Sequence, residues 1–133
     1  MVHRSSSQRS DPLRLVAAVF VAGIGGIHLY LYFYYFHTVH IFGPLFIANC
    51  VTGVLLALWL LISDGVLPLI AGAGYAATTV IAFLVNVKWG YFGFQDAFSG
   101  SWQFAAGLLE VVTAVMLTTM ALRPRPHRMF IQR

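Results

Sequence analysis

The chain has 133 residues, of which 59% are hydrophobic and only 9% are charged, and its formal net charge is +4. Soluble domains carry about 25% charged residues, so this chain has too little charge to cover a soluble domain of its size. The length corresponds to one domain, and a single cysteine excludes an internal disulfide bond. We therefore expect an integral membrane protein whose main partner is the lipid bilayer.

Charged residues are absent from long stretches of the sequence. No Asp, Glu, Lys or Arg occurs from Leu15 to Ser63 or from Gly65 to Val87, and Ala97 to Leu122 contains only Glu110. A membrane-spanning helix needs about 20 apolar residues to cross roughly 30 Å of hydrocarbon. The first stretch is long enough for two such helices, so the sequence predicts an all-α fold, a four-helix transmembrane bundle.

The elements expected in chain order are a tail, four spans and a second tail. Residues 1–12 are polar and rich in serine, which predicts a disordered cytoplasmic tail. The apolar stretch that follows is too long for the core of a cleavable signal peptide, so it is expected to remain as the first span. The predicted spans are residues 13–36, 41–62, 66–87 and 101–122, followed by a basic cytoplasmic tail at 123–133.

Turn signals separate these spans. Pro44 and Pro68 each fit the first turn of a helix, where proline is tolerated. Ser63-Asp64-Gly65 is typical of a tight turn, and Pro124 and Pro126 end the last span.

The basic residues predict the orientation. All but one of the eight Lys and Arg residues lie in or beside the tails, and the exception is Lys88. The positive-inside rule then places both termini in the cytoplasm, as in a multi-pass protein of the inner (cytoplasmic) cell membrane. Anionic lipid headgroups account for the tail arginines. We expect no nucleic-acid partner, because a compact basic face with base-reading residues is absent from the sequence.

Three polar residues are expected at one depth inside the spans: His28, Asn49 and Glu110. Each is about eight residues from the outer end of its span, which corresponds to roughly 12–13 Å below the outer surface. A charged group near the bilayer centre costs several kcal/mol unless it is paired or hydrated. Glu110 is therefore expected to face His28, with which it could share a proton, and Asn49 could bridge the two.

The predicted cluster extends along the helices through Thr79, Tyr32 and Thr113. Thr79 lies near the same level in the third span, Tyr32 one turn above His28, and Thr113 one turn below Glu110. Two interpretations stay open. One is an outward-facing site that binds or passes a small ligand or a proton, and the other is a structural clasp of interhelical hydrogen bonds that fixes the register of the helices.

Aromatic residues are concentrated in two outward segments. They are Tyr30, Tyr32, Phe33, Tyr34, Tyr35, Phe36, Phe42 and Phe46, and then Trp89, Tyr91, Phe92, Phe94, Phe98, Trp102 and Phe104. Interfacial belts enrich Trp and Tyr at both membrane faces, whereas these residues favour one face. They could form an aromatic-walled vestibule for a flat apolar molecule such as a quinone, or a one-sided belt.

Metal and haem sites have weak support in the sequence, and no cofactor is predicted. His37 and His40 have the spacing of metal ligands if their turn is helical, and Asp96 could be a third ligand. Bis-histidine haem needs two histidines on facing helices, and only His28 lies inside a span.

At His28-Leu-Tyr-Leu-Tyr, Phe42-Gly-Pro-Leu-Phe-Ile-Ala-Asn and Tyr91-Phe-Gly-Phe-Gln-Asp, the chain resembles a group of uncharacterised small four-span bacterial integral membrane proteins. The likeness covers most of residues 13–122. It implies the span count and no activity, cofactor or site.

Three functions remain open at this point. The leading hypothesis is a non-catalytic membrane protein whose polar cluster binds or passes a small ligand or proton. Small residues four apart, at Ala18, Ala22 and Gly26 and at Gly72 and Ala76, allow close helix packing and suit a homo-oligomer or an accessory subunit of a larger membrane complex. The third hypothesis is a membrane redox protein that holds haem, metal or quinone.

Overall fold

The computed structural model of the protein describes residues 11–97 and 100–124. These residues form four α-helices and one π-helical turn: α1 (Pro12–Leu31), η1 (Tyr32–Phe36), α2 (Phe42–Ile62), α3 (Leu67–Trp89) and α4 (Ser101–Ala121). Most of the two predicted tails, together with Phe98, lies outside the described residues.

All four stretches are long and apolar enough to cross a membrane, which confirms the prediction of four membrane-length helices. Their outward-facing side chains are apolar in mid-helix: Val19, Leu55, Ile81 and Val115 are each about 60% exposed. Contiguous apolar surface of this extent is rare on soluble monomers. The chain therefore has four helices suited to a multi-pass membrane protein.

Local signals set the helix ends. The Asp11 carboxylate accepts a hydrogen bond from the Leu13 amide at 3.1 Å and caps α1, and Pro12 occupies the first turn. Pro68 has the same place in α3, as the sequence predicts. Gly90 ends α3 with a φ of 73°, a conformation that favours glycine, so this helix extends two residues beyond the predicted end.

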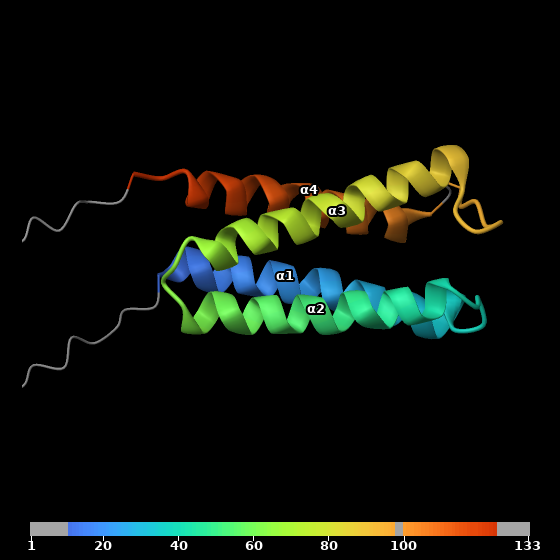
Figure 1. Cartoon of the computed structure of the whole chain (residues 1–133), viewed down its shortest axis with the longest axis horizontal. Helices are drawn as coiled ribbons and strands as arrows, with labels where there is room; N and C mark the ends of the chain where they lie inside the picture. The colour runs from blue at the N-terminus through green and yellow to red at the C-terminus, as the bar shows by residue number, and fades with distance from the viewer. Residues whose placement is uncertain (1–10, 98–99, 125–133) are drawn as a thin grey trace, which may run out of the picture.

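The helices run antiparallel in chain order (Figure 1). Residues 11 and 124 lie at the same end of the bundle as the turn between α2 and α3, and we call this the tail end. Residues 32–41, 90–97 and 100 lie at the opposite end, the loop end. α1 packs mainly against α2, and α3 mainly against α4. α3 runs obliquely to α2, so these two helices diverge toward the loop end (Figure 1).

Two glycines allow α1 and α2 to touch along their backbones. A Cβ atom added to Gly25 would lie 3.1 Å from the Cys50 carbonyl oxygen, and one added to Gly53 would lie 3.1 Å from the Gly25 Cα and 2.8 Å from the Tyr75 hydroxyl. Small residues at such crossings are a main source of helix association in membranes.

The small-residue stripe that the sequence indicated on α1, at Ala18, Ala22 and Gly26, coincides only partly with the face that contacts α2. Ala18 is buried, whereas Gly26 is exposed and a Cβ atom added to it would meet nothing within 4 Å. The contact instead follows Gly25, one residue or about 100° further round the helix.

The hydrophobic core occupies the tail half of the bundle. Its buried residues are Ala17, Ala18, Val21, Ala57, Leu60, Leu69, Leu117 and Met120. Arg14 closes the tail end of this core, because its buried guanidinium donates hydrogen bonds to the carbonyl oxygens of Leu60, Ser63 and Gly65, the last at 2.6 Å. α1 is thereby tied to the turn that joins the two helix pairs.

Replacement of Gly53 by valine is expected to destabilise the protein by roughly 1–3 kcal/mol, because the new side chain would push α2 away from α1 and from Tyr75. Thermal unfolding of the purified protein in detergent measures the effect. Gly26→Ala is the matched control and should be neutral or stabilising by up to about 1 kcal/mol. Equal melting temperatures for the two variants would contradict the close glycine contact.

Candidate functional site

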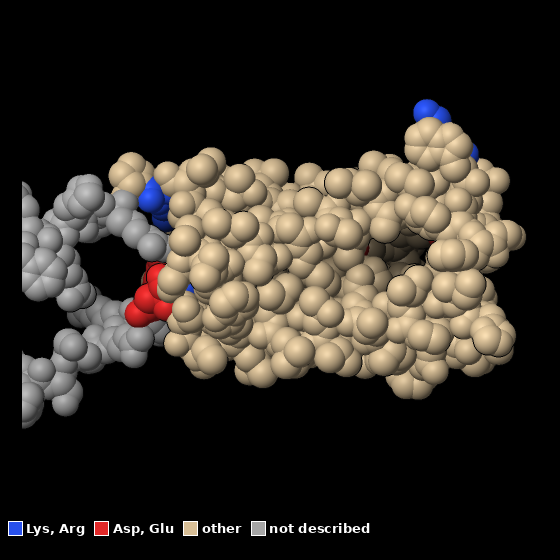
Figure 2. Space-filling view, viewed as in Figure 1, with Lys and Arg blue, Asp and Glu red and all other residues tan. Residues whose placement is uncertain are grey.

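A cavity of about 1050 Å³ lies in the loop half of the bundle, between the two helix pairs. All four helices line it, and its deepest lining residues toward the tail end are Leu56 and Ala71. Figure 2 shows the surface hollowed near the loop end, on the face where α2 and α3 lie in Figure 1. The charged atoms on the outer surface of this face lie near the two ends of the bundle. Pockets for small molecules usually measure about 300–1,000 Å³, so the volume suffices for a ligand.

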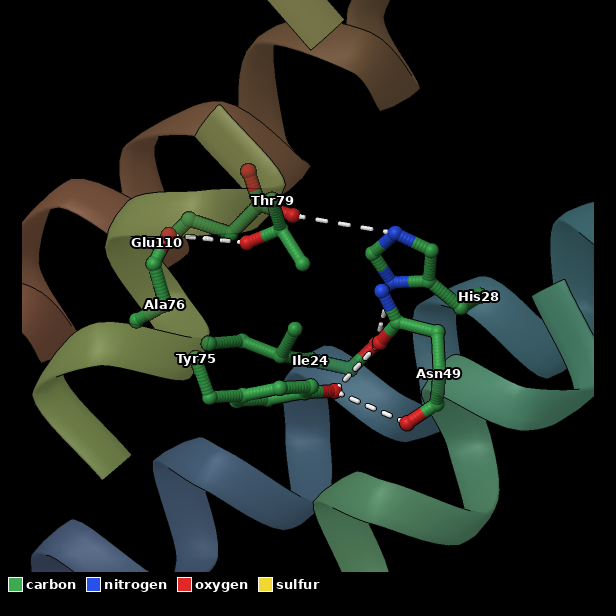
Figure 3. A network of polar contacts seen from close by, with 7 residues as sticks. All are labelled: Ile24, His28, Asn49, Tyr75, Ala76, Thr79 and Glu110. Atoms are coloured by element: carbon green, nitrogen blue, oxygen red, sulfur yellow. Dashed lines mark hydrogen bonds and ion pairs between the residues drawn. The ribbon is translucent and has the colours of Figure 1, made fainter. Parts of the chain in front are cut away.

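His28 projects into this cavity from α1 with one ring nitrogen already in use. Its Nδ1 lies 2.9 Å from the carbonyl oxygen of Ile24. A carbonyl oxygen can only accept, so Nδ1 carries a proton and donates it. The other nitrogen, Nε2, points toward α4 (Figure 3).

Glu110 faces that nitrogen from α4. Its Oε1 lies 3.9 Å from His28 Nε2, and the residue is only 4% exposed. The separation permits electrostatic attraction but exceeds the 2.7–3.2 Å of a direct hydrogen bond. Thr79 lies beside the carboxyl group, and its own hydroxyl donates to the Ala76 carbonyl oxygen at 2.8 Å (Figure 3). His28 and Glu110 are thus close neighbours that form no direct hydrogen bond.

Asn49 pairs with a residue that the sequence analysis missed. The Tyr75 hydroxyl of α3 donates to the Asn49 side-chain oxygen and lies 3.1 Å from the Asn49 carbonyl oxygen (Figure 3). Asn49 therefore bonds α2 to α3, and the described contacts show no bridge from it to His28 or Glu110. Tyr75 precedes Thr79 by one helical turn, so the periodicity of α3 would have placed both on one face.

Asn86 is the second residue that the sequence analysis missed. It lines the cavity, is 6% exposed, and its Oδ1 atom has no hydrogen-bond partner among the described residues. Buried polar atoms nearly always have a partner, so an exception calls for a reason. Asn86 follows Thr79 by two helical turns, which places it on the same face of α3, nearer the loop end.

Four phenylalanines, which we call the aromatic cap, cover the loop end of the cavity beside α2: Phe36, Phe42, Phe46 and Phe94. Phe36 stacks on Phe46 with a centroid distance of 4.5 Å, and Phe46 lies 5.2 Å from the His28 ring. Phe36 belongs to η1, which the sequence did not predict. Such π-helical turns occur frequently at functional sites.

The connection between α3 and α4 folds back to complete the cap. Tyr91 and Phe94 pair through two backbone hydrogen bonds of 2.8 Å around a turn with positive φ at Phe92 and Gly93. The Gln95 side chain donates to the Val87 carbonyl oxygen at 2.9 Å and holds the turn against the end of α3. Phe94 thereby reaches Phe42 at a centroid distance of 5.0 Å.

The remaining predicted site residues lie elsewhere. Tyr32 does not line the cavity, and its ring lies 5.1 Å from that of Phe33 and 6.5 Å from that of His37. Thr113 is fully buried, and its hydroxyl donates to the Leu109 carbonyl oxygen at 2.6 Å. The aromatic residues that do line the cavity beyond the aromatic cap are Tyr35, Tyr75, Phe83, Tyr91 and Trp102.

The weak metal prediction gains no support from the geometry. Within residues 11–97 and 100–124, no group of three or more His, Cys, Asp or Glu residues could hold a metal ion. His37 and His40 are exposed on the turn at the loop end, whereas Asp96 lines the cavity.

No family model matches the chain, and comparisons with curated proteins and with solved structures found no match either. The resemblance to small four-span bacterial proteins therefore stays a prediction. The fold and the cavity define an all-helical protein with four helices long and apolar enough to span a membrane, and with a mainly apolar pocket that His28 and Glu110 line.

Replacement of Asn86 by leucine is expected to raise the free energy of unfolding by roughly 1–3 kcal/mol, because an unpartnered buried acceptor gives way to an apolar side chain of similar size. Thermal unfolding of the purified protein, freed of bound small molecules, measures the change. Leu84→Asn is the reverse substitution, because it places an amide on the exposed apolar face of α3, where such an acceptor is unfavourable. A clear loss of stability in the Asn86 variant would show that its oxygen has a partner after all.

Proposed function

We propose that this protein binds a small, partly polar ligand in the cavity, with His28 and Glu110 as its polar anchor. The loop end would face outward and both tails the cytoplasm, as in a protein of the cytoplasmic membrane, because the basic residues gather at the tails. The single observation that carries the proposal is an imidazole and a carboxyl group, 3.9 Å apart, in the wall of one cavity of about 1050 Å³.

Ligand binding accounts for this geometry better than a structural clasp does. A clasp made by His28 and Glu110 needs the two groups in direct hydrogen-bond contact, whereas they lie 3.9 Å apart. The interhelical bond that does form joins Tyr75 to Asn49 and involves neither of them. Protein interiors are close-packed, so a large space beside a costly intramembrane acid calls for a use. Both groups retain hydrogen-bonding capacity toward the space that they line.

Binding also has more support than passage across the membrane. The lining of the cavity ends at Leu56 and Ala71, and the core fills the tail half beyond them. Arg14 lies buried at the tail end of that core. A ligand or proton that reached Glu110 would meet packed apolar side chains on the way to the tails, so the site is better suited to holding a molecule.

Glu110→Gln tests the proposal, because glutamine keeps the shape of the side chain and removes its charge. Native mass spectrometry of protein purified in mild detergent should find a small molecule bound to the wild type and at least tenfold less of it on the variant, the loss of one charge-assisted contact. Thr119→Val is the control, since Thr119 is exposed on α4 outside the cavity and its hydroxyl only bonds its own helix.

Two other results would overturn the proposal. Wild-type protein without any small molecule, together with a loss of stability in Glu110→Gln, would favour the structural clasp. Stable co-purification with other protein subunits, unaffected by Glu110→Gln, would favour an accessory subunit of a larger membrane complex.

The proposed orientation has its own test. A cysteine at Thr38, which is exposed at the loop end, should react in intact cells with a membrane-impermeant maleimide when Cys50 is replaced by alanine. A cysteine at Asp64, in the turn at the tail end, should react only after the cells are lysed. The reverse labelling pattern would place the tails outside.

A further inference from the structure

The cavity opens sideways, through the face of the bundle between α2 and α3. Five of its lining residues are exposed on this face: Leu45, Ala48 and Thr52 of α2, and Thr78 and Ala82 of α3. The hollow in Figure 2 lies on the long side of the molecule, where α3 diverges from α2 in Figure 1. The opening therefore interrupts the apolar flank of the bundle.

This opening lies at the depth of the acyl chains. Ala48 and Thr52 are six and ten residues inside α2, which corresponds to about 9–15 Å from its loop end. The Thr52 hydroxyl donates to the Ala48 carbonyl oxygen at 2.8 Å, so its polarity on the α2 side of the rim is satisfied within the helix. The aromatic cap covers the loop end beside α2. A molecule dissolved in the bilayer can therefore reach the cavity through the opening between α2 and α3, without passing the aromatic cap.

The free polar atoms of the cavity specify what such a molecule must carry. Asn86 Oδ1 is a carbonyl oxygen, so it requires a hydrogen-bond donor. At the other end, Nε2 of uncharged His28 or the Glu110 carboxylate of an ion pair is an acceptor too. On α3, Asn86 is about 10 Å along the helix from Thr79, which lies beside Glu110. The ligand must therefore carry a hydrogen-bond donor at each of its two ends, a short distance apart.

The walls between these two ends are aromatic. Phe46 lies against His28, Phe83 and Tyr91 line the α3 side, and Trp102 the α4 side. Aromatic walls favour a flat ring, which they contact by offset stacking or edge-to-face packing. A single ring with hydroxyl groups on opposite edges meets the polar and the apolar requirements together.

We infer that the ligand is a bilayer-soluble quinol, a dihydroxylated ring with an apolar tail, which enters between α2 and α3. One hydroxyl group donates to Asn86, the other binds between His28 and Glu110, and the tail leaves through the side opening into the lipid. This inference rests on the proposed function, because it names the ligand class of the same cavity.

The donor requirement separates the quinol from its oxidised form. A quinone offers only acceptors, so it leaves Asn86 Oδ1 without a partner. Replacement of Asn86 by leucine removes that requirement at one end of the cavity, so the variant should distinguish the two forms less strongly than the wild type does. A merely structural Asn86 would leave the discrimination unchanged.

The probes are decylhydroquinone, decylbenzoquinone and the dimethyl ether of the hydroquinone. Purified protein in nanodiscs is immobilised, equilibrated with each probe under nitrogen, and the bound amount in excess of empty nanodiscs is measured by chromatography and mass spectrometry. We expect the wild type to bind the hydroquinone at least tenfold more tightly than the quinone or the ether, the effect of one or two hydrogen bonds. In Asn86→Leu this preference should fall about tenfold, because only the contact at His28 and Glu110 remains.

The entry route is tested by tryptophan at the rim. Ala48→Trp and Ala82→Trp narrow the opening, so they should slow hydroquinone association at least several-fold. Ala105→Trp is the matched control, because Ala105 is exposed on α4 and does not line the cavity. Equal association rates for all three variants would overturn entry between α2 and α3.

The outcomes separate this inference from the proposed function. If the three probes bind equally or not at all, while another small molecule co-purifies with the wild type and is lost in Glu110→Gln, the quinol inference is wrong and the proposed function stands. If neither the probes nor a co-purified molecule occupies the cavity, both are wrong.

Discussion

The structure depends on the backbone contact between α1 and α2 at Gly25 and Gly53. Because no side chain separates them there, these two helices form a tight pair, and the Tyr75 hydroxyl packs against the same glycine from α3. The second pair, α3 and α4, joins the first through the core of the tail half, where Arg14 ties α1 to the connecting turn. An oblique α3 cannot follow α2 over its whole length, so the loop half is left with the cavity.

Polar side chains within the helices fall into two groups. Thr52, Thr79, Thr113 and Thr119 each donate to a carbonyl oxygen one turn earlier in their own helix. These bonds satisfy the hydroxyl groups wherever they face, as a membrane interior requires. The second group turns away from its own backbone: Asn49 pairs with Tyr75 of another helix, and His28 Nε2, Glu110 and Asn86 Oδ1 face the cavity. Polar atoms that the backbone of their own helix does not occupy therefore identify the site better than polarity alone does.

The candidate site was predictable in depth but not in direction. His28 and Glu110 lie at one level because each is about eight residues from the end of its helix, and the structure does bring them to 3.9 Å. Asn49 has the same depth and also lines the cavity, but its side chain bonds Tyr75 and bridges neither His28 nor Glu110. Tyr32 and Thr113 do not line the cavity. Rotation about the helix axis is set by packing against the adjacent helices, which depth along the axis does not reveal. Asn86 was missed because an amide near a helix end is usually exposed, and only the structure shows that this one is buried.

By itself the sequence determined the helical class, the number of helices and their ends to within a few residues. Uncharged stretches of about 20 residues favour membrane-length helices, and proline and glycine mark the turns. Only the tertiary structure decided which helices pair, that η1 and the turn around Phe92 build the aromatic cap, and that a cavity remains between the pairs. Those features arise from the crossing angle of α3 and the close approach of Gly25 to Gly53, contacts between residues far apart in the chain whose geometry no local pattern encodes.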